Sequence, residues 1–275
     1  MTFAMPISAS RTLARLPRQA QAGSSLLWRS ALVFFGFFAI LYAGTFIDSR
    51  LFNGVSQWEK PAKFFLSLSL HMATLACGLA LLPATDRQRP SIRLATIIFL
   101  VAAIGEVIYI TFRAARGEAS HFNETTTIAW LLYAAMGMGA VALSVVTGFI
   151  GWRIVKYAPP SALAFTTGLG FILAGVMAVL FGGYMSQHGA HWVGGNLSDA
   201  TGLPFFHWST TGGDLRVPHF FGLHIMQALP VLGFLLRDVA PTKARRLVGL
   251  GAILWVGLTF LTFVQAISGQ PLIRL

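Results

Sequence analysis

The chain is poor in charged side chains and almost free of cysteine. Only 11% of its 275 residues are Asp, Glu, Lys or Arg, whereas charged residues make up about a quarter of an average soluble domain. Cys77 is the only cysteine, which excludes an intrachain disulfide and a cysteine-based metal cluster. Acidic residues are scarcer than basic ones, nine against twenty, and the net charge is +11. This composition argues against an ordinary soluble domain.

Long apolar runs take the place of the missing charge. Six runs contain no charged residue, and a seventh is interrupted only by Glu106. Each is long enough for a helix to cross about 30 Å of hydrocarbon, and a lone strand in lipid would leave its backbone groups unpaired. The predicted fold is therefore all-α, a polytopic membrane protein with seven transmembrane helices. The runs are Ser30–Ile47, Phe64–Thr85, Leu94–Phe112, Thr125–Trp152, Tyr157–Gln187, Val217–Leu236 and Leu247–Ile273.

The basic residues between the runs predict the orientation. Alternate connections carry thirteen and seven of them. Because the side richer in Lys and Arg stays in the cytoplasm, we predict a cytoplasmic N-terminus and an external C-terminus. The abundance of Arg, Ala and Gly is typical of a bacterial protein, so the bacterial inner membrane is the expected location. Topology explains the net charge, so the expected partner is the lipid bilayer and not nucleic acid.

The chain divides into a tail and one membrane domain. Residues 1–27 are predicted to form a basic cytoplasmic tail, with a targeting segment as the alternative, and residues 28–275 form the seven-helix domain. Within this domain, the segment 186–216 is long for a connector and rich in aromatic residues, which disordered segments lack. We expect an ordered extracytoplasmic loop over the outer mouth of the bundle.

All seven histidines fall on the predicted outer side or inside the membrane. His188 and His191 are three residues apart in the long loop, and His121 and His207 also lie in outer connections. Zinc takes three or four such ligands, so these four histidines are candidate metal ligands. No single helix carries a metal-binding spacing, and a site would need several segments of the chain.

Polar residues recur at helical spacing inside three of the runs, which places them on one face of each helix. Ionisable side chains at this depth normally point into the bundle, because exposure to hydrocarbon is costly. We therefore expect an outward-opening polar cavity to which several helices contribute. The stripes are Lys63, Ser67, His71 and Thr74; Glu106, Tyr109 and Arg113; and Arg216, His224 and Gln227, with His219 turned away from His224.

Candidate roles follow from the chemistry of these side chains. His71 and His224 are candidate axial ligands of one b-type haem, and the alternative is a pair of hydrogen-bonded intramembrane histidines. Two helices begin at the outer mouth beside basic residues, which favours a small anionic ligand. The candidate catalytic residues are Glu106, His224 and Asp214. The candidate cofactor-binding residues are His71, His224, His219, Arg216, Lys63 and Arg113.

Several functions remain open at this point. The leading hypothesis is binding of a haem, a zinc-like metal or a small ligand in membrane redox chemistry. The alternatives are an intramembrane metal-dependent hydrolase, a carrier, and an assembly factor without catalysis, so enzymatic activity is undecided. Small residues four apart, such as Gly170 and Ala174, allow close helix packing within the chain, in a homo-oligomer or with a membrane-complex partner.

Three stretches are similar to those of an uncharacterised group of bacterial polytopic inner-membrane proteins. They are Lys60-Pro-Ala-Lys-Phe64, Ser120-His-Phe-Asn123 and the segment from Trp208 to His224, whose sequence is WSTTGGDLRVPHFFGLH. The resemblance covers most of the chain. It implies a bacterial membrane protein and implies no activity.

Overall fold

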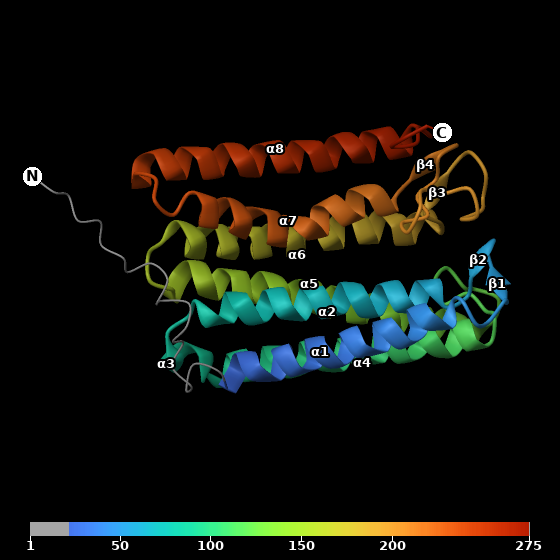
Figure 1. Cartoon of the computed structure of the whole chain (residues 1–275), viewed down its shortest axis with the longest axis horizontal. Coiled ribbons are helices and arrows are strands. Elements are labelled where there is room, and N and C mark those ends of the chain that lie inside the picture. Colours follow the sequence, from blue (N-terminus) through green and yellow to red (C-terminus); the bar gives the residue numbers. More distant parts are fainter. Residues whose placement is uncertain (1–21, 275) are drawn as a thin grey trace, which may run out of the picture.

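Seven long helices lie side by side in the computed structural model, which describes residues 22–274 (Figure 1). All seven are long and apolar enough to cross a membrane, so the chain is a multi-pass membrane protein, as predicted. The short helix α3 (Ala84–Arg87) joins the second long helix to the third. The long helices are α1 (Ala22–Gly44), α2 (Glu59–Ala80), α4 (Pro90–Ala115), α5 (Thr127–Tyr157), α6 (Ala162–His188), α7 (Arg216–Leu235) and α8 (Pro241–Ile267).

The helix bounds differ from the apolar runs because charged residues extend several helices. Helix α2 begins at Glu59 and includes both Lys60 and Lys63, and α5 continues to Tyr157 beyond Arg153. Long basic side chains at the end of a span keep the charged group near water while the stem stays apolar. Helix α1 begins at Ala22, inside the predicted tail of residues 1–27. The rest of that tail lies outside the described residues.

The two ends of the bundle are built differently. One end, here called the strand end, consists of residues 45–58, 116–126, 189–215 and 268–274, and the other end carries α3 (Figure 1). Two short antiparallel pairs lie at the strand end. They are β1 (Leu51–Phe52) with β2 (Val55–Ser56), and β3 (Trp192–Val193) with β4 (Gly213–Asp214).

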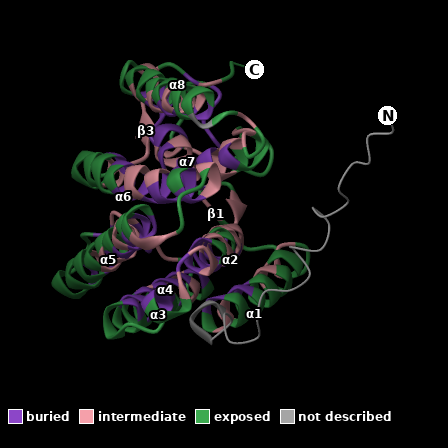
Figure 2. Ribbon diagram, turned by 90° about the vertical axis from the view of Figure 1, so that its left-hand side faces the viewer, coloured by how far each residue is buried: buried purple, intermediate pink, exposed green. Residues whose placement is uncertain are grey.

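The helices stack in layers when the bundle is viewed along its axis (Figure 2). Helix α8 lies against α7 and α6, the pair α5 and α2 follows, and α4 and α1 lie on the far side, so that buried residues line the facing sides. The outward faces of α1, α5 and α8 carry large exposed apolar side chains such as Leu32, Val145 and Ile253. Contiguous apolar surface of this kind suits contact with lipid.

Glycines allow the central helices to approach closely. A Cβ at Gly151 of α5 would lie 2.6 Å from the carbonyl oxygen of Gly168 on α6, and a Cβ at Gly170 would lie 2.9 Å from the carbonyl oxygen of Ile225 on α7. Small residues let membrane helices pack backbone to backbone. The sequence-predicted Gly170 therefore serves packing within this chain, between α6 and α7.

A buried ion pair closes the α3 end. Arg153 of α5 donates to Asp86 of α3 at 2.6 Å, and both side chains are less than a tenth exposed. Arg89 also reaches Asp86, at 2.8 Å, and the Arg153 guanidinium lies 4.1 Å from the centre of the Tyr157 ring. The connection between α2 and α4 is thereby tied to the end of α5.

We predict that Gly151→Ala destabilises the protein, because the added methyl group would press on the α6 backbone. Gly148, one turn earlier on α5, has nothing within 4 Å of a Cβ, so Gly148→Ala is the matched control. The apparent melting temperature in detergent should fall by several degrees for Gly151→Ala. It should stay level or rise for Gly148→Ala, since alanine favours helix by about 1 kcal/mol over glycine. Equal melting temperatures for the two variants would contradict the close α5–α6 contact.

Candidate functional site

The long connection between α6 and α7 folds back on itself over the strand end. Helix α6 ends at Gly189, whose φ of +73° lies in the left-handed region that glycine adopts without strain. Strand β3 then pairs with β4, and the Leu215 amide donates to the carbonyl of His191. Trp208 is buried and stacks on Phe206 at 4.5 Å. These contacts hold the loop's charged residues close to the first turn of α7.

Arg216, at the start of α7, is the centre of a charge network. Its guanidinium donates to both carboxylate oxygens of Asp214, the shortest contact being 2.7 Å, and to Asp199 at 2.9 Å. It also donates to the carbonyl oxygen of His207. Asp214 is 2% exposed and accepts two further bonds, from the backbone amides of Ser209 and Arg216. The Arg216 side chain is partly buried, and these acceptors compensate for the water that its guanidinium loses.

The same network reaches α2 and the end of α6. His207 Nε2 lies 2.8 Å from Glu59 Oε2, and the same Glu59 oxygen accepts from Lys63 at 2.7 Å. On the other side, His191 Nε2 lies 3.5 Å from Asp199. We call the connected side chains the strand-end network. Its members are Glu59, Lys63, His191, Asp199, His207, Asp214 and Arg216.

Lys60 lies beside this network without joining it. It is half-buried in the first turn of α2, within electrostatic reach of Arg216, Asp199, Glu106 and His121. No ion pair within 4 Å involves its ammonium group anywhere in residues 22–274. The other lysine of this turn, Lys63, is neutralised by Glu59. Lys60 is therefore an unpaired cation at the mouth of the bundle.

Two further polar groups near this point are buried and unpaired. Glu106 of α4 is 6% exposed, and its Oε1 has no hydrogen-bond partner in the described part of the chain. This oxygen faces Gly139 of α5, where a Cβ would lie 3.1 Å away. The indole Nε1 of Trp192, next to His191, is also buried without an acceptor. The site thus offers one free carboxylate oxygen and free donors.

Charge and burial shift the pKa values of the loop residues. Burial, followed by the nearby positive charge of Lys60, holds the pKa of His121 well below its ordinary value. Burial likewise lowers the pKa of His191, although Asp199 acts in the opposite direction. Burial alone would raise the pKa of Asp199, but the hydrogen bond with His191 and the charge of Arg216 lower it instead. At neutral pH Asp199 is therefore ionised and lies between the neutral His191 and Arg216.

The predicted haem ligands face different neighbours. His71 Nε2 is 2.8 Å from Thr147 Oγ1 of α5, and its ring contacts Phe99. The His224 ring lies 4.0 Å from that of Phe220, on the side of α7 where Gln227 donates to Thr74 of α2. His71 Nε2 thus has a hydrogen-bond partner on α5. His71 and His224 lie within electrostatic reach of each other, and haem ligation by this pair stays a prediction.

The remaining predicted intramembrane residues fall into two groups. His219 packs against Gly182 of α6, and its Nδ1 has no partner in residues 22–274. Glu106 faces α5 and lies in reach of Lys60, while Lys63, Arg216 and Asp214 all belong to the strand-end network. The charged groups thus gather at the strand end, and inside the bundle His224 lies within electrostatic reach of both His71 and His219. The single shared cavity stays a prediction.

The four candidate metal ligands take separate partners. His121 contacts Ser120 and lies between the rings of Phe64 and Tyr133, and His188 Nε2 lies 3.2 Å from the carbonyl oxygen of Trp192. His191 and His207 pair with Asp199 and Glu59. In residues 22–274, no three His, Cys, Asp or Glu side chains are arranged to hold a metal ion. The geometry thus gives the metal prediction no support.

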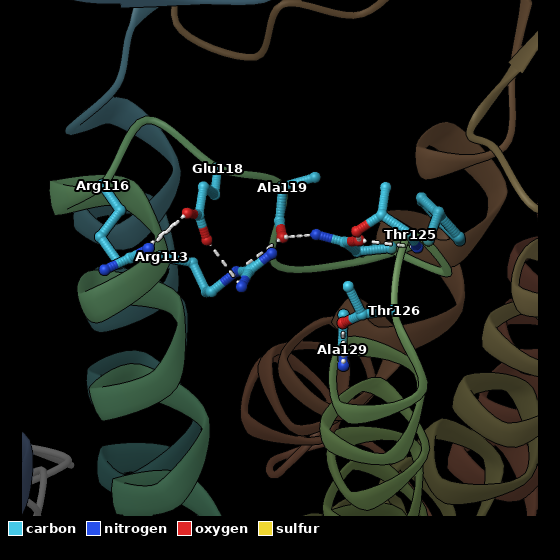
Figure 3. Close-up of a pocket in the computed structure, with 9 residues that line it drawn as sticks. Arg113, Arg116, Glu118, Ala119, Thr125, Thr126 and Ala129 are labelled. Carbon is cyan, nitrogen blue, oxygen red and sulfur yellow. Dashed lines mark hydrogen bonds and ion pairs between the residues drawn. The ribbon is translucent and has the colours of Figure 1, made fainter.

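Arg113 lies elsewhere, on the wall of an open pocket between the end of α4 and the start of α5 (Figure 3). It donates to Glu118 at 2.7 Å and to the carbonyl oxygen of Ala119 at 3.1 Å. The pocket has a volume of about 570 Å³. Arg113 was predicted to share a site with Glu106, but its guanidinium turns to the connection after α4.

Two residues of the site, Glu59 and Asp199, were not among the sequence-predicted candidates, and Lys60 was expected only as one of the basic residues beside an outer helix start. Glu59 and Lys60 precede Lys63 in the same turn of α2, and Asp199 lies in the long loop. The available signal was the concentration of acids in the same connections as Arg216 and the lysines. Charge balance between loops indicates that such pairs form, but it does not identify the partners.

Comparisons with protein-family models, with curated proteins and with solved structures find no match to this chain.

We predict that the protein loses stability as the pH falls from about 7 to about 5, because the lowered pKa of His121 opposes protonation in the fold. The unfolded chain takes up the proton near pH 6.5, so this contribution is complete above about 6.5 and is lost below it. One such histidine changes stability by at most about 1.4 kcal/mol per pH unit. His121→Gln should flatten the pH dependence of the apparent melting temperature.

The control for this measurement is His188→Gln, because His188 is exposed. It should keep the wild-type pH dependence. A His121→Gln protein that loses stability with acid as steeply as the wild type would rule out His121 as the source.

Proposed function

We propose that this is a bacterial inner-membrane protein that binds a small anionic ligand at its strand end, which faces the outside, and that Lys60 is the cation in contact with the ligand. The observation that carries the proposal is the position of Lys60. A half-buried ammonium lies among charged groups and has no ion pair of its own within residues 22–274. Removing a charge from water without a partner is costly, and a bound anion would offset that cost.

The pairing of the carboxylates favours an anion over a cation as the direct partner of Lys60. Lys63 pairs with Glu59, and Arg216 pairs with both Asp199 and Asp214, so every carboxylate of the strand-end network is already bonded to a basic side chain, although the three carboxylates outnumber these two basic groups by one. Lys60 adds a positive charge, and it sits in the first turn of α2, where the helix dipole adds positive potential. Pro61 suits this turn, because its missing N–H is one that helices leave unpaired.

Neighbouring donors would complete the contact. Trp192 Nε1 is buried without an acceptor, and His191 Nε2 is 3.5 Å from Asp199, a long hydrogen-bond distance. Both belong to the loop whose fold depends on Arg216. A ligand carboxylate or phosphate has several acceptor lone pairs, which matches an ammonium and adjacent N–H donors.

A carrier is a second candidate, favoured by the proline inside helix α7. Pro230 cannot donate to the carbonyl of Met226, and the amide oxygen of Gln227 has no partner in the described residues. Carriers use backbone groups that are free of helix hydrogen bonds near their binding sites. Uptake of a bound anion into proteoliposomes would separate a carrier from a binding protein.

The test is the affinity of purified protein for small anions, with inorganic phosphate and succinate as probes and tryptophan fluorescence as the signal. We predict that Lys60→Gln weakens binding roughly tenfold or more, since a charge-assisted contact contributes about 1.5–3 kcal/mol. Lys60→Arg should retain most of the affinity. Lys243→Gln is the control, because it removes an exposed lysine from the opposite end of the bundle.

Two results would overturn the proposal. One is wild-type protein that binds neither probe, and the other is Lys60→Gln protein that is folded and binds as tightly as the wild type. The apparent melting temperature of each variant establishes whether it is folded.

A further inference from the structure

The open pocket between α4 and α5 is separate from the Lys60 site. Neither Lys60 nor any member of the strand-end network lines it. Its walls come from the last turn of α4, the connection 116–126 and the first turn of α5 (Figure 3). Since α4 and α5 are membrane spans, the pocket lies where two helices leave the hydrocarbon, at the level of lipid headgroups.

The pocket carries more positive than negative charge. Arg113 and Arg116 both line it, and one carboxylate, Glu118, binds both of them. Arg113 is held by Glu118 and by the Ala119 carbonyl and is only 13% exposed, whereas the Arg116 side chain is 57% exposed. One carboxylate between two guanidinium groups leaves one positive charge uncompensated. An anion entering the pocket would meet Arg116 first.

The α5 side of the pocket is the start of a long helix. The side chain of Thr126 caps α5 by accepting from the Ala129 amide, and the hydroxyl of Thr125 donates to the side chain of Asn123. The backbone amides of Thr127 and Ile128, next to these residues but outside the pocket lining, have no acceptor in residues 22–274. Free amides at the start of a long helix add positive potential. The cavity, the surplus guanidinium and this potential therefore all favour an anionic group.

The surface below Arg116 is apolar and faces outward. Ile108 and Phe112 precede it at intervals of four residues, which places all three on one face of α4, and both are more than half exposed. The Arg116 guanidinium lies 5.7 Å from the centre of the Phe112 ring. A molecule whose anionic group occupies the pocket could thus lay an acyl chain along this face.

We propose that the pocket binds the phosphate group of an anionic phospholipid, with Arg116 as its main contact and Arg113 behind it. Glu118 competes with the phosphate for the two arginines and must release Arg116 when the lipid binds. Because Glu118 contacts both arginines, this exchange predicts opposite effects for the positive and the negative side chains. Loss of Arg116 weakens lipid binding, and loss of the Glu118 charge strengthens it.

The experiment measures lipid binding to delipidated protein in a neutral detergent, by native mass spectrometry and by the shift in apparent melting temperature. The probes are phosphatidylglycerol, phosphatidylcholine and inorganic phosphate. Phosphatidylglycerol should bind most tightly, and Arg116→Gln should lower its affinity about fivefold, the contribution expected of one basic residue near an anionic lipid. Glu118→Gln should raise the affinity. Arg245→Gln, which removes an exposed arginine at the opposite end, should leave it unchanged.

Three outcomes would overturn the proposal. Phosphatidylcholine that binds as tightly as phosphatidylglycerol would remove the role of net charge. Inorganic phosphate that protects the protein as well as the lipid does would make the site one for a free anion. Equal lipid affinity in Arg116→Gln and Glu118→Gln would show that the two residues serve only the local structure. Because Lys60 lies outside this pocket, the Lys60→Gln protein should bind the lipid normally whether or not the Lys60 site exists.

Discussion

The conformation of the strand end depends on the ion pairs and hydrogen bonds of Arg216. Its guanidinium binds Asp214, Asp199 and the carbonyl oxygen of His207, and these three acceptors come from different parts of the long loop. A partly buried charge is stabilised by a full set of partners, and the loop conformation in the structure supplies one to Arg216. The bond between His207 and Glu59 then fastens this loop to α2. The contacts of Arg216 and His207 thereby connect α7, the long loop and α2.

The two ends of the bundle differ in how completely their charged side chains are paired. At the α3 end, Arg153 and Asp86 neutralise each other, and Arg89 supplies a second cation at the surface. In the strand-end network, the carboxylates are all bonded to Arg216, Lys63 and the two histidines, and the neighbouring Lys60 has no ion pair in residues 22–274. The first arrangement suits a structural lock. The second leaves Lys60 available to the anion that we propose as its ligand.

The sequence was sufficient for the spans because lipid imposes one simple requirement, a long apolar helix. It was insufficient for the site, because helical spacing gives the face of a helix and not the helix that this face meets. His71 and His224 were each expected inside the bundle, but their spacing did not predict that His71 contacts Thr147 of α5 and that His224 lies near Phe220. The pairs His207–Glu59 and Arg216–Asp199 join residues that are 148 and 17 positions apart. Their contacts depend on the fold of the loop, which has no periodic pattern.

The two proposed sites favour ligands of different size, because their surroundings differ. Lys60 lies inward, between α2, α4 and the long loop, among groups that are already paired, so a ligand there must be small and must approach from the strand end. The Arg116 pocket lies at the membrane boundary above an apolar helix face, so its ligand can carry a long acyl chain. Arg113 and Glu106 occupy the same face of α4, two turns apart. That one helix therefore contributes to both sites, with Glu106 in reach of Lys60 and Arg113 on the wall of the pocket.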